Sequence, residues 1–256
     1  MKIKELFENT IDWEKFKQGN NLDCSSNKMT SLEGAPQKVD GDFSCSSNLL
    51  TSLEGAPREV GGHFSCNYNQ LTSLEGAPQE IGGGFDCSDN RLTSLEGAPQ
   101  EIDGGFDCSD NRLTSLEGAP QKGGGHFSCS SNQLTSLEGA PLKVKGSFYC
   151  HENRLTSLEG APQKVGGDFY CYINPLKSLK GIGKDYLKEI NGTIDLDACH
   201  IESHMLGLLK VKGLTKIKFN RNRKVEEILN NHLKTRDLLS CQEELIENGL
   251  EQYAQL

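Results

Sequence analysis

The chain has 256 residues and lacks any long hydrophobic run. Its mean hydropathy is −0.54, and no apolar stretch approaches the roughly 20 residues that a membrane-spanning helix needs. No apolar segment follows the charged N-terminal residues Lys2, Lys4 and Glu5, as one would in a secretory signal. We therefore expect a soluble, cytoplasmic protein that does not contact a membrane.

Motifs of the common catalytic folds are missing as well. The chain contains no G-x-S-x-G nucleophile elbow, no P-loop and no dinucleotide-binding fingerprint. We expect no enzymatic activity, no catalytic residue and no cofactor. The ten cysteines, in a chain without an export signal, predict reduced thiols rather than a disulfide framework.

What the chain has instead is a repeat of 21 residues. Phenylalanine, asparagine and proline recur at this step, and so do eight of the ten cysteines. A fixed period in this range indicates a stacked solenoid, in which each unit buries its apolar edge only against its neighbours. The cysteines of the series are Cys24, Cys45, Cys66, Cys87, Cys108, Cys129, Cys150 and Cys171.

Each unit reads P-x-x-V-G-G-x-F-x-C-S-x-N-x-L-T-S-L-E-G-A. Phe43 and Cys45 alternate with polar residues, which predicts a short strand with one apolar face. Asn48 is expected to turn the chain and to satisfy backbone groups of adjacent coils with its amide. The glycine pair before each phenylalanine predicts a tight bend into the next strand, and the strands are expected to stack as one parallel sheet.

The F-x-C-x-x-N-x-L-x-x-L part of the unit resembles the leucine-rich repeat, and the T-S-L-x-x-x-P return resembles the short repeats of bacterial effector proteins, some of which are ubiquitin ligases. The resemblance covers residues 22–176. It departs from the family where cysteine and phenylalanine replace leucine in the strand, and where the segment from Val39 to Phe43 is one residue longer. The resemblance implies a leucine-rich-repeat solenoid with a parallel β-sheet, extended return segments and little helix.

We expect three regions along the chain. Residues 1–20 carry apolar residues such as Trp13 and Phe16 among charges, which predicts an N-terminal helical cap; residues 21–175 form the eight repeats. Residues 176–256 are expected to form a small α+β C-terminal domain, with strands at 192–196 and 214–219 and helices over 223–256. The end of the chain resembles the tails of uncharacterised repeat proteins from tailed bacteriophages, which implies a viral protein made in the bacterial cytoplasm.

Charge is distributed unevenly. Residues 21–175 hold 20 acidic and 10 basic residues, a net charge of −10, which makes nucleic acid an improbable partner because phosphate would be repelled. The exception is the basic segment 210–224, from Lys210 to Lys224, which holds no acidic residue. It is interpreted as a solvated strand face or, alternatively, as a phosphate- or acid-binding patch.

Candidate partner-binding residues lie where the repeats differ at outward strand positions. Tyr149, Tyr170, Tyr172 and His151 replace serine over the last two coils, and tyrosine is favoured in binding surfaces. A second, acidic group consists of Asp86, Asp107, Asp89 and Asp110. The alternative interpretations are that Arg91 and Arg112 neutralise the aspartates, and that the C-terminal region covers the tyrosines.

Cysteine and histidine offer two further possibilities. We interpret the cysteine ladder as a small core filler, because alternation with phenylalanine points it inward. A zinc site built from Cys199, His200, His204, His232 and Cys241 is conceivable, but their spacing matches no known knuckle, so we expect no metal.

The leading functional hypothesis is a non-enzymatic protein-binding scaffold, such as a phage-encoded inhibitor of a host or anti-phage defence protein. The first alternative is a ubiquitin-ligase-like effector enzyme that would use Cys241 as nucleophile. The second is a nucleotide-signal sponge that would stack a base on the tyrosines. The identity of the partner and the oligomeric state are left open by the sequence, as is the choice between the sheet face and the basic segment as the binding surface.

Overall fold

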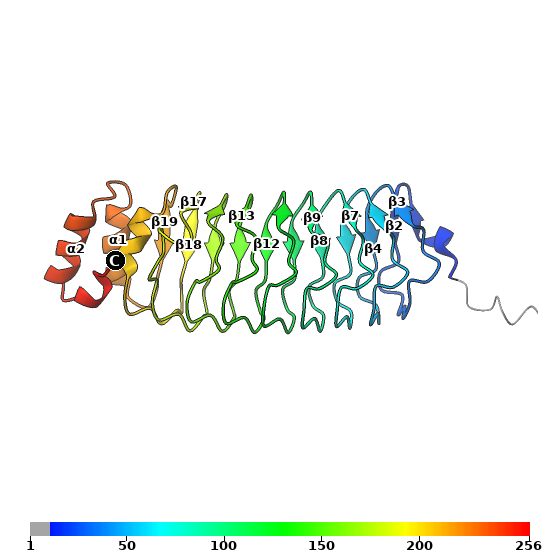
Figure 1. The fold of residues 1–256 in the computed structure, drawn as a ribbon, viewed down its shortest axis with the longest axis horizontal. Helices are drawn as coiled ribbons and strands as arrows, with labels where there is room; N and C mark the ends of the chain where they lie inside the picture. Colours follow the sequence, from blue (N-terminus) through cyan, green and yellow to red (C-terminus); the bar gives the residue numbers. More distant parts are fainter. Residues whose placement is uncertain (1–10) are drawn as a thin grey trace, which may run out of the picture.

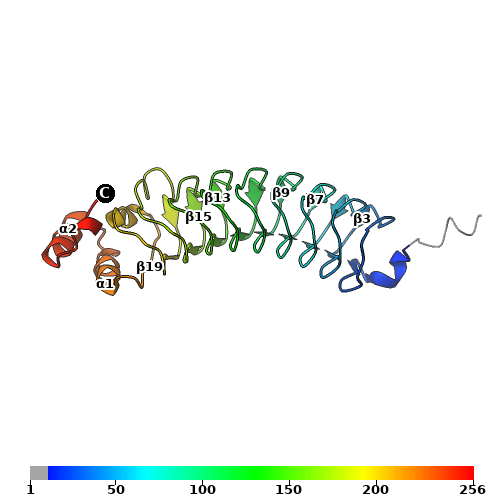
Figure 2. The same ribbon diagram turned by 90° about the horizontal axis from the view of Figure 1, so that it is seen from below.

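A computed structural model describes residues 11–256. The described chain forms a parallel-sheet β-solenoid of about nine turns, which ends in a few short helices (Figure 1). Figure 2 shows the coils as an arc, in which β3, β7, β9, β13 and β15 lie toward the outer side and β19 toward the inner side. None of the helices in this part of the chain is long and apolar enough to cross a membrane.

One sheet of 11 strands runs the length of the solenoid. Every neighbouring pair is parallel except the first, β1 with β2. The strands, in spatial order, are β1 (Lys17–Gln18), β2 (Asn21–Asp23), β4 (Phe43–Ser44), β6 (Phe64–Ser65), β8 (Phe85–Asp86), β10 (Phe106–Asp107), β12 (Phe127–Ser128), β14 (Phe148–Tyr149), β16 (Phe169–Tyr170), β18 (Thr193–Asp195) and β19 (Lys216–Lys218).

A second set of short strands was not expected from the sequence. Each precedes a glycine pair or its equivalent, and they pair in three small parallel sheets instead of one continuous sheet. These strands are β3 (Lys38–Val39), β5 (Glu59–Val60), β7 (Glu80–Ile81), β9 (Glu101–Ile102), β11 (Lys122–Gly123), β13 (Lys143–Val144), β15 (Lys164–Val165) and β17 (Glu189–Ile190).

The predicted inward alternation of phenylalanine and cysteine is confirmed. The phenylalanine rings stack from coil to coil with centroids 5.3 to 5.7 Å apart. All eight ladder cysteines are fully buried, and burial raises the pKa of their thiols. Six of the eight thiols, from Cys24 to Cys129, donate to a carbonyl of the next coil, as Cys87 Sγ does to Asp107 O at 3.2 Å. Cysteine therefore fills a small core position and adds a weak bond between coils.

The asparagine at the end of each strand bonds to adjacent coils, as predicted. Asn90 Nδ2 donates to the carbonyls of Cys66, Cys87 and Ser88, and Asn90 Oδ1 accepts from the backbone N–H of Leu71. The same pattern recurs in successive coils, for example at Asn111. A single amide thus satisfies polar groups of two coils at the point where the strand ends.

The chain bends at the glycine pair before each strand, as predicted, but the reason for glycine is close packing of the coils and not a left-handed backbone. Neither Gly61 nor Gly62 adopts a left-handed backbone; the left-handed glycine of that repeat is Gly55, with φ of +86°. A Cβ atom on Gly62 would lie 2.9 Å from the carbonyl carbon of Gly41. Glycine is required here because neighbouring coils approach too closely for a side chain.

At the N-terminal end, only part of the predicted cap falls within the described residues. A 3-10 turn, η2 (Trp13–Phe16), buries Trp13 and Phe16, and the Trp13 ring lies 6.5 Å from that of Phe43. Residues 17–20 continue as strand β1 and a turn, so the helix expected there is absent. Residues 1–10 lie outside the described part of the chain.

The C-terminal region continues the sheet beyond the eight regular repeats. The predicted strands appear as β18 and β19, but they join the long sheet at longer intervals: Ile194 pairs with Phe169, and Ile217 with Ile194. The 3-10 helix η3 (Met205–Lys210) lies between these two strands, and the helices α1 (Arg223–His232), α2 (Leu238–Glu247) and η4 (Glu251–Tyr253) follow β19. The proposed domain boundary at residue 176 stays a prediction.

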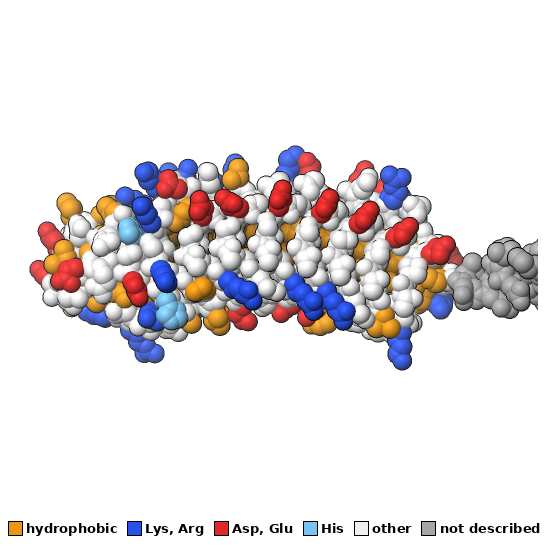
Figure 3. Space-filling model, turned by 60° about the horizontal axis from the view of Figure 1, so that its bottom comes forward, with side chains coloured by type: hydrophobic (Ala, Val, Ile, Leu, Met, Phe, Trp, Pro, Cys, Tyr) orange, Lys and Arg blue, Asp and Glu red, His pale blue; other side chains and the backbone are white. Residues whose placement is uncertain are grey.

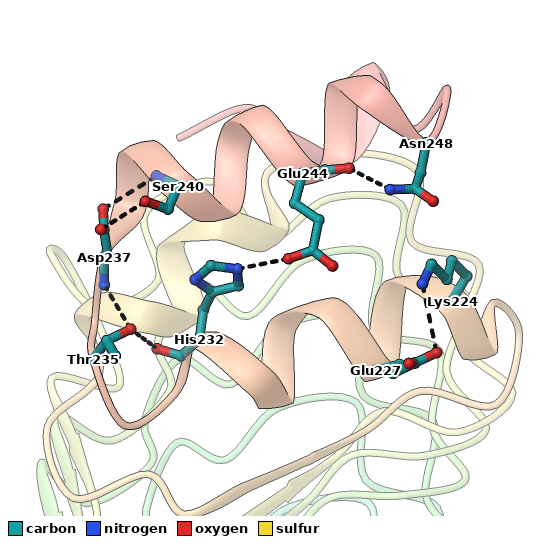
Figure 4. Close-up of polar contacts among 8 residues, drawn as sticks. All are labelled: Lys224, Glu227, His232, Thr235, Asp237, Ser240, Glu244 and Asn248. Carbon is teal, nitrogen blue, oxygen red and sulfur yellow. Dashed lines mark hydrogen bonds and ion pairs between the residues drawn. The ribbon is translucent and has the colours of Figure 1, made fainter.

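Helix α1 terminates the long sheet. Asn230 accepts a hydrogen bond from the N–H of Ile217 at 2.9 Å and donates to its carbonyl at 2.8 Å, while Glu226 accepts from the N–H of Phe219. Side chains thereby take the place of a further strand at this edge. Figure 4 shows α1 held to α2 by His232 Nε2 and Glu244 Oε2, which are 2.8 Å apart.

Candidate functional site

The outward side of the long sheet carries three parallel lanes of side chains, which we call the sheet face. Each regular strand contributes the residue before phenylalanine, the residue after it and the residue after cysteine, because side chains two apart share a face. Parallel pairing without stagger places equivalent residues of neighbouring coils side by side, as for Asp86 with Asp107 and Tyr149 with Tyr170. Sequence differences between repeats therefore become positions along one surface.

Four aromatic side chains form an aromatic platform on this face: Tyr149, His151, Tyr170 and Tyr172. The rings of Tyr149 and Tyr170 are stacked with centroids 5.0 Å apart and planes 8° apart. His151 and Tyr172 are stacked beside them, with centroids 4.2 Å apart. All four side chains are half-buried, and the structure brings together the group that the sequence predicted.

Polar contacts fix the platform. Tyr170 Oη donates to Asp168 Oδ2 at 3.0 Å, and burial, followed by this bond, raises the pKa of Tyr170. His151 Nδ1 is buried without a hydrogen-bond partner among the described residues, and burial lowers the pKa of His151. On the next coils, Asp195 forms an ion pair of 3.0 Å with Lys218. The C-terminal helices leave these tyrosines partly exposed, so the expected covering is wrong.

Next to the platform the sheet face is hollowed. This acidic hollow, of about 260 Å³, is lined by His63, Ser65, Gly84, Phe85, Asp86, Gly105, Asp107 and His126. Gly84 and Gly105 occupy the position before phenylalanine, where the flanking coils have His63 and His126. These two coils therefore contribute no side chain to the floor of the hollow at that position. Both imidazoles lean over the glycines: Gly84 donates its N–H to His63 Nδ1 at 2.9 Å, and a Cβ on Gly105 would lie 2.9 Å from His126 Cε1.

The two aspartates of the hollow have no cationic partner in the described part of the chain. Asp86 Oδ1 accepts from the N–H and hydroxyl of Ser88, and Asp107 Oδ1 accepts in the same way from Ser109. Burial is the main cause that raises the pKa of Asp86, and the negative charge of Asp107 adds to it. The hydrogen bonds from Ser88 and the nearby imidazole of His126 act in the opposite direction and partly offset this increase in the pKa of Asp86.

The other two predicted aspartates are placed differently. Asp89 and Asp110 have φ of +51° and +53° and lie in the turn after the strand, outside the three lanes. Burial, followed by the charge of Asp110, raises the pKa of Asp89. Within residues 11–256, neither Arg91 nor Arg112 forms an ion pair with any of the four aspartates, so the alternative that these arginines offset the aspartates gains no support from a direct contact.

Sequence reasoning missed one further acidic feature. The glutamate of each T-S-L-E-G segment is exposed, and these glutamates follow one another at the 21-residue step. Figure 3 shows a regular row of acidic side chains along the length of the molecule, as such a step requires. Members of the row are Glu33, Glu54, Glu75, Glu96, Glu117, Glu138 and Glu159. The signal for this row is a glutamate that recurs at the 21-residue step of the repeat.

The basic segment 210–224 is partly neutralised. Lys218 pairs with Asp195, and Lys224 lies 3.7 Å from Glu227 (Figure 4). Lys210, Lys212 and Lys216 are exposed at the end of η3 and around β19. Through β19, the last strand of the long sheet, the segment brings positive charge to the end of the sheet.

The histidines and cysteines of the conceivable zinc site are engaged separately. His204 Nδ1 lies 3.0 Å from Ser178 Oγ, and His232 bonds to Glu244 (Figure 4). Across residues 11–256, no three His, Cys, Asp or Glu side chains are grouped to hold a metal ion. Cys241 is buried in α2, and burial, with Glu244 and Asp237 nearby, raises its pKa to about 12.

No protein-family model and no curated protein matches the chain. The function is therefore argued from the geometry of the sheet face.

Proposed function

We propose that this chain is a leucine-rich-repeat scaffold without enzymatic activity, which binds another protein through its sheet face. The observation that carries the proposal is the aromatic platform: four aromatic side chains, held in two stacked pairs on adjacent strands, are partly exposed beside an acidic hollow. Rings already ordered on a rigid sheet lose little side-chain entropy on binding. Tyrosine side chains of this kind dominate the energetics of many protein interfaces.

The proposed partner follows from the resemblance of the repeats and of the tail. Together they favour a phage-encoded inhibitor that captures a host or anti-phage defence protein in the bacterial cytoplasm. The acidic coils beside the platform support a partner with a basic surface, because complementary charge speeds association. The same charge speaks against a nucleotide signal, whose phosphates would meet Asp168 beside Tyr170.

The ubiquitin-ligase alternative has less support, because the thiol of Cys241 is buried and its pKa is raised. A thiol with a pKa of about 12 holds almost no thiolate at neutral pH, and the thiolate is the nucleophile. Trapping with an activated ubiquitin-like donor would leave the protein unlabelled under native conditions.

The proposal is tested by capture from host cell extract with the immobilised full-length protein. Proteins retained by the wild type are compared with those retained by the triple variant Tyr149→Ala, Tyr170→Ala, Tyr172→Ala. Tyr68→Ala is the control, since it removes an exposed tyrosine from a turn outside the sheet face. We expect a specific partner to be retained by the wild type and the control and to be lost with the triple variant.

Circular dichroism and melting of the triple variant establish that the solenoid is intact. A folded triple variant that retains the partner as well as the wild type does would refute the sheet face as the binding surface. The basic segment 210–224 would then be tested by the same comparison.

A further inference from the structure

The acidic hollow contains two aspartates and two histidines, but no lysine or arginine lines it. Asp86 and Asp107 are adjacent in parallel register, and among the described residues no lysine or arginine pairs with either. Each uses its Oδ1 atom for the serine two residues later, and no described donor reaches Oδ2. Two free carboxylate oxygens on neighbouring coils therefore border a hollow that a cation can enter.

The shape of the hollow favours a planar cation. Gly84 and Gly105 contribute no side chains to its floor, and the imidazoles of His63 and His126 lean over these glycines from the two ends, so flat rings line it. A guanidinium group is flat, donates from several N–H groups in fixed directions and stacks on aromatic rings. An ammonium group would carry the same charge without that match.

The aromatic platform begins where the hollow ends. His126, at the border of the hollow, lies with its ring centroid 6.2 Å from that of Tyr149, edge to face. With roughly 4.8 Å between strands, the centre of the hollow is about 12 Å from Tyr149 along the solenoid axis. An extended peptide advances about 3.4 Å per residue, so three or four residues bridge that distance.

We propose that the sheet face recognises an extended segment of the partner in which an arginine enters the acidic hollow and an apolar residue, three or four positions away, packs on the aromatic platform. This inference rests on the proposed function and specifies the chemistry of the partner. The segment crosses the strands, so that its side chains meet successive coils. Arginine balances the two carboxylates, and the apolar residue covers the rings of Tyr149 and Tyr170.

The test uses the full-length protein and a capped glycine heptapeptide with arginine at its second position and phenylalanine at its sixth. Matched peptides carry citrulline, which keeps the shape without the charge, or lysine, which keeps the charge without the planar group. Binding is followed by amide chemical shifts, with the N–H groups of Gly84 and Gly105 as reporters in the floor of the hollow. We expect the arginine peptide to shift these signals and the citrulline peptide to bind at least about tenfold more weakly, since a charge-assisted contact is lost.

The double variant Asp86→Asn, Asp107→Asn is compared with Glu96→Gln, Glu117→Gln. Both remove two negative charges from the same two repeats, but Glu96 and Glu117 belong to the exposed row outside the sheet face. The first variant should weaken the arginine peptide about tenfold, and the second should leave it within about twofold. Equal losses in the two variants, or equal binding of arginine and citrulline peptides, would overturn the inference.

Different results would refute protein binding through the sheet face and recognition of arginine in the acidic hollow. If the arginine peptide shows no preference while the folded tyrosine variant still loses its partner, protein binding stands and the arginine assignment falls. If the tyrosine variant keeps its partner, the proposed function falls whatever the peptides show.

Discussion

Replacing Asn90 by alanine is expected to destabilise the solenoid far more than the same replacement at Asn27. Both residues occupy the same position in their repeats, but only Asn90 has a complete preceding coil. Its amide makes four hydrogen bonds, three from Nδ2 to carbonyls and one to Oδ1 from the N–H of Leu71. Asn27 is exposed, and its side chain donates only to Cys24 O and Ser25 O.

The expected loss in the free energy of unfolding depends on which polar groups are left without any hydrogen-bond partner. Without Asn90, the carbonyls of Cys66 and Cys87 keep the bonds from Asn69 and Asn111, and Ser88 O keeps that from the N–H of Tyr68. The buried N–H of Leu71 is left with no acceptor, which costs about 1–3 kcal/mol. The three carbonyls that each lose one hydrogen bond add to this cost. We therefore expect Asn90→Ala to lower the free energy of unfolding by about 3–4 kcal/mol, and Asn27→Ala to lower it by less than about 1 kcal/mol.

Urea unfolding of the two variants measures this difference, and hydrogen exchange at the Leu71 amide shows where it arises. Exchange at Leu71 should accelerate in Asn90→Ala and stay slow in Asn27→Ala. Equal destabilisation of the two variants, or an unchanged exchange rate at Leu71, would show that the asparagine ladder does not hold neighbouring coils together.

Three further predictions concern the core, the hollow and the end of the sheet. Cys87→Ser should destabilise the protein by only about 1 kcal/mol, because Asp107 O offers the new hydroxyl an acceptor. Phe85→Ala should destabilise it by about 3–5 kcal/mol, because it removes a buried ring. Urea unfolding compares the two variants, and a larger effect of the serine variant would contradict the proposed packing of the core. Asp86→Asn should raise the melting temperature at pH 7: the folded-state pKa of Asp86 is raised, so stability associated with its protonated form is lost as pH rises through that pKa. The advantage should shrink as the pH falls through the raised pKa of Asp86, because the wild-type carboxyl then becomes neutral as well. An advantage that does not change with pH would exclude this cause. Asn230→Ala should destabilise by about 2–4 kcal/mol, since the N–H and carbonyl of Ile217 both lose a partner, while Asn231→Ala, at an exposed neighbour, should be near neutral; similar melting temperatures for the two would refute the edge-terminating role of Asn230.

The stacked coils, the buried cysteine ladder and the bonding role of asparagine were all predictable from the sequence. Each depends on contacts between equivalent residues of adjacent repeats, and those contacts are implied once the period is known. The aromatic platform was predictable for the same reason: residues 21 apart, such as Tyr149 and Tyr170, must stand side by side in an unstaggered parallel sheet.

Structural features that do not follow the 21-residue repeat could not be predicted from the sequence. The continuation of the sheet through β18 and β19 was hidden because Ile194 and Ile217 follow at irregular intervals. The termination of that sheet by Asn230 joins a helix to a strand 13 residues away, a contact with no repeating signal. The bend at Gly62 was predictable, but the close approach of the neighbouring coil, which excludes a side chain there, was not.

The sequence by itself determined the solenoid, its core and the residues that face outward together, because a repeat converts one local pattern into many identical neighbours. Only the tertiary structure decided that Asp86 and Asp107 border a hollow without a compensating cation, and that Arg91 and Arg112 do not pair with them. It also decided that the tyrosines stay partly exposed instead of lying beneath the C-terminal helices. The physical reason is that the conformation of an exposed side chain depends on the width of its coil and on the side chains at neighbouring outward positions. The repeated sequence pattern determines neither of these.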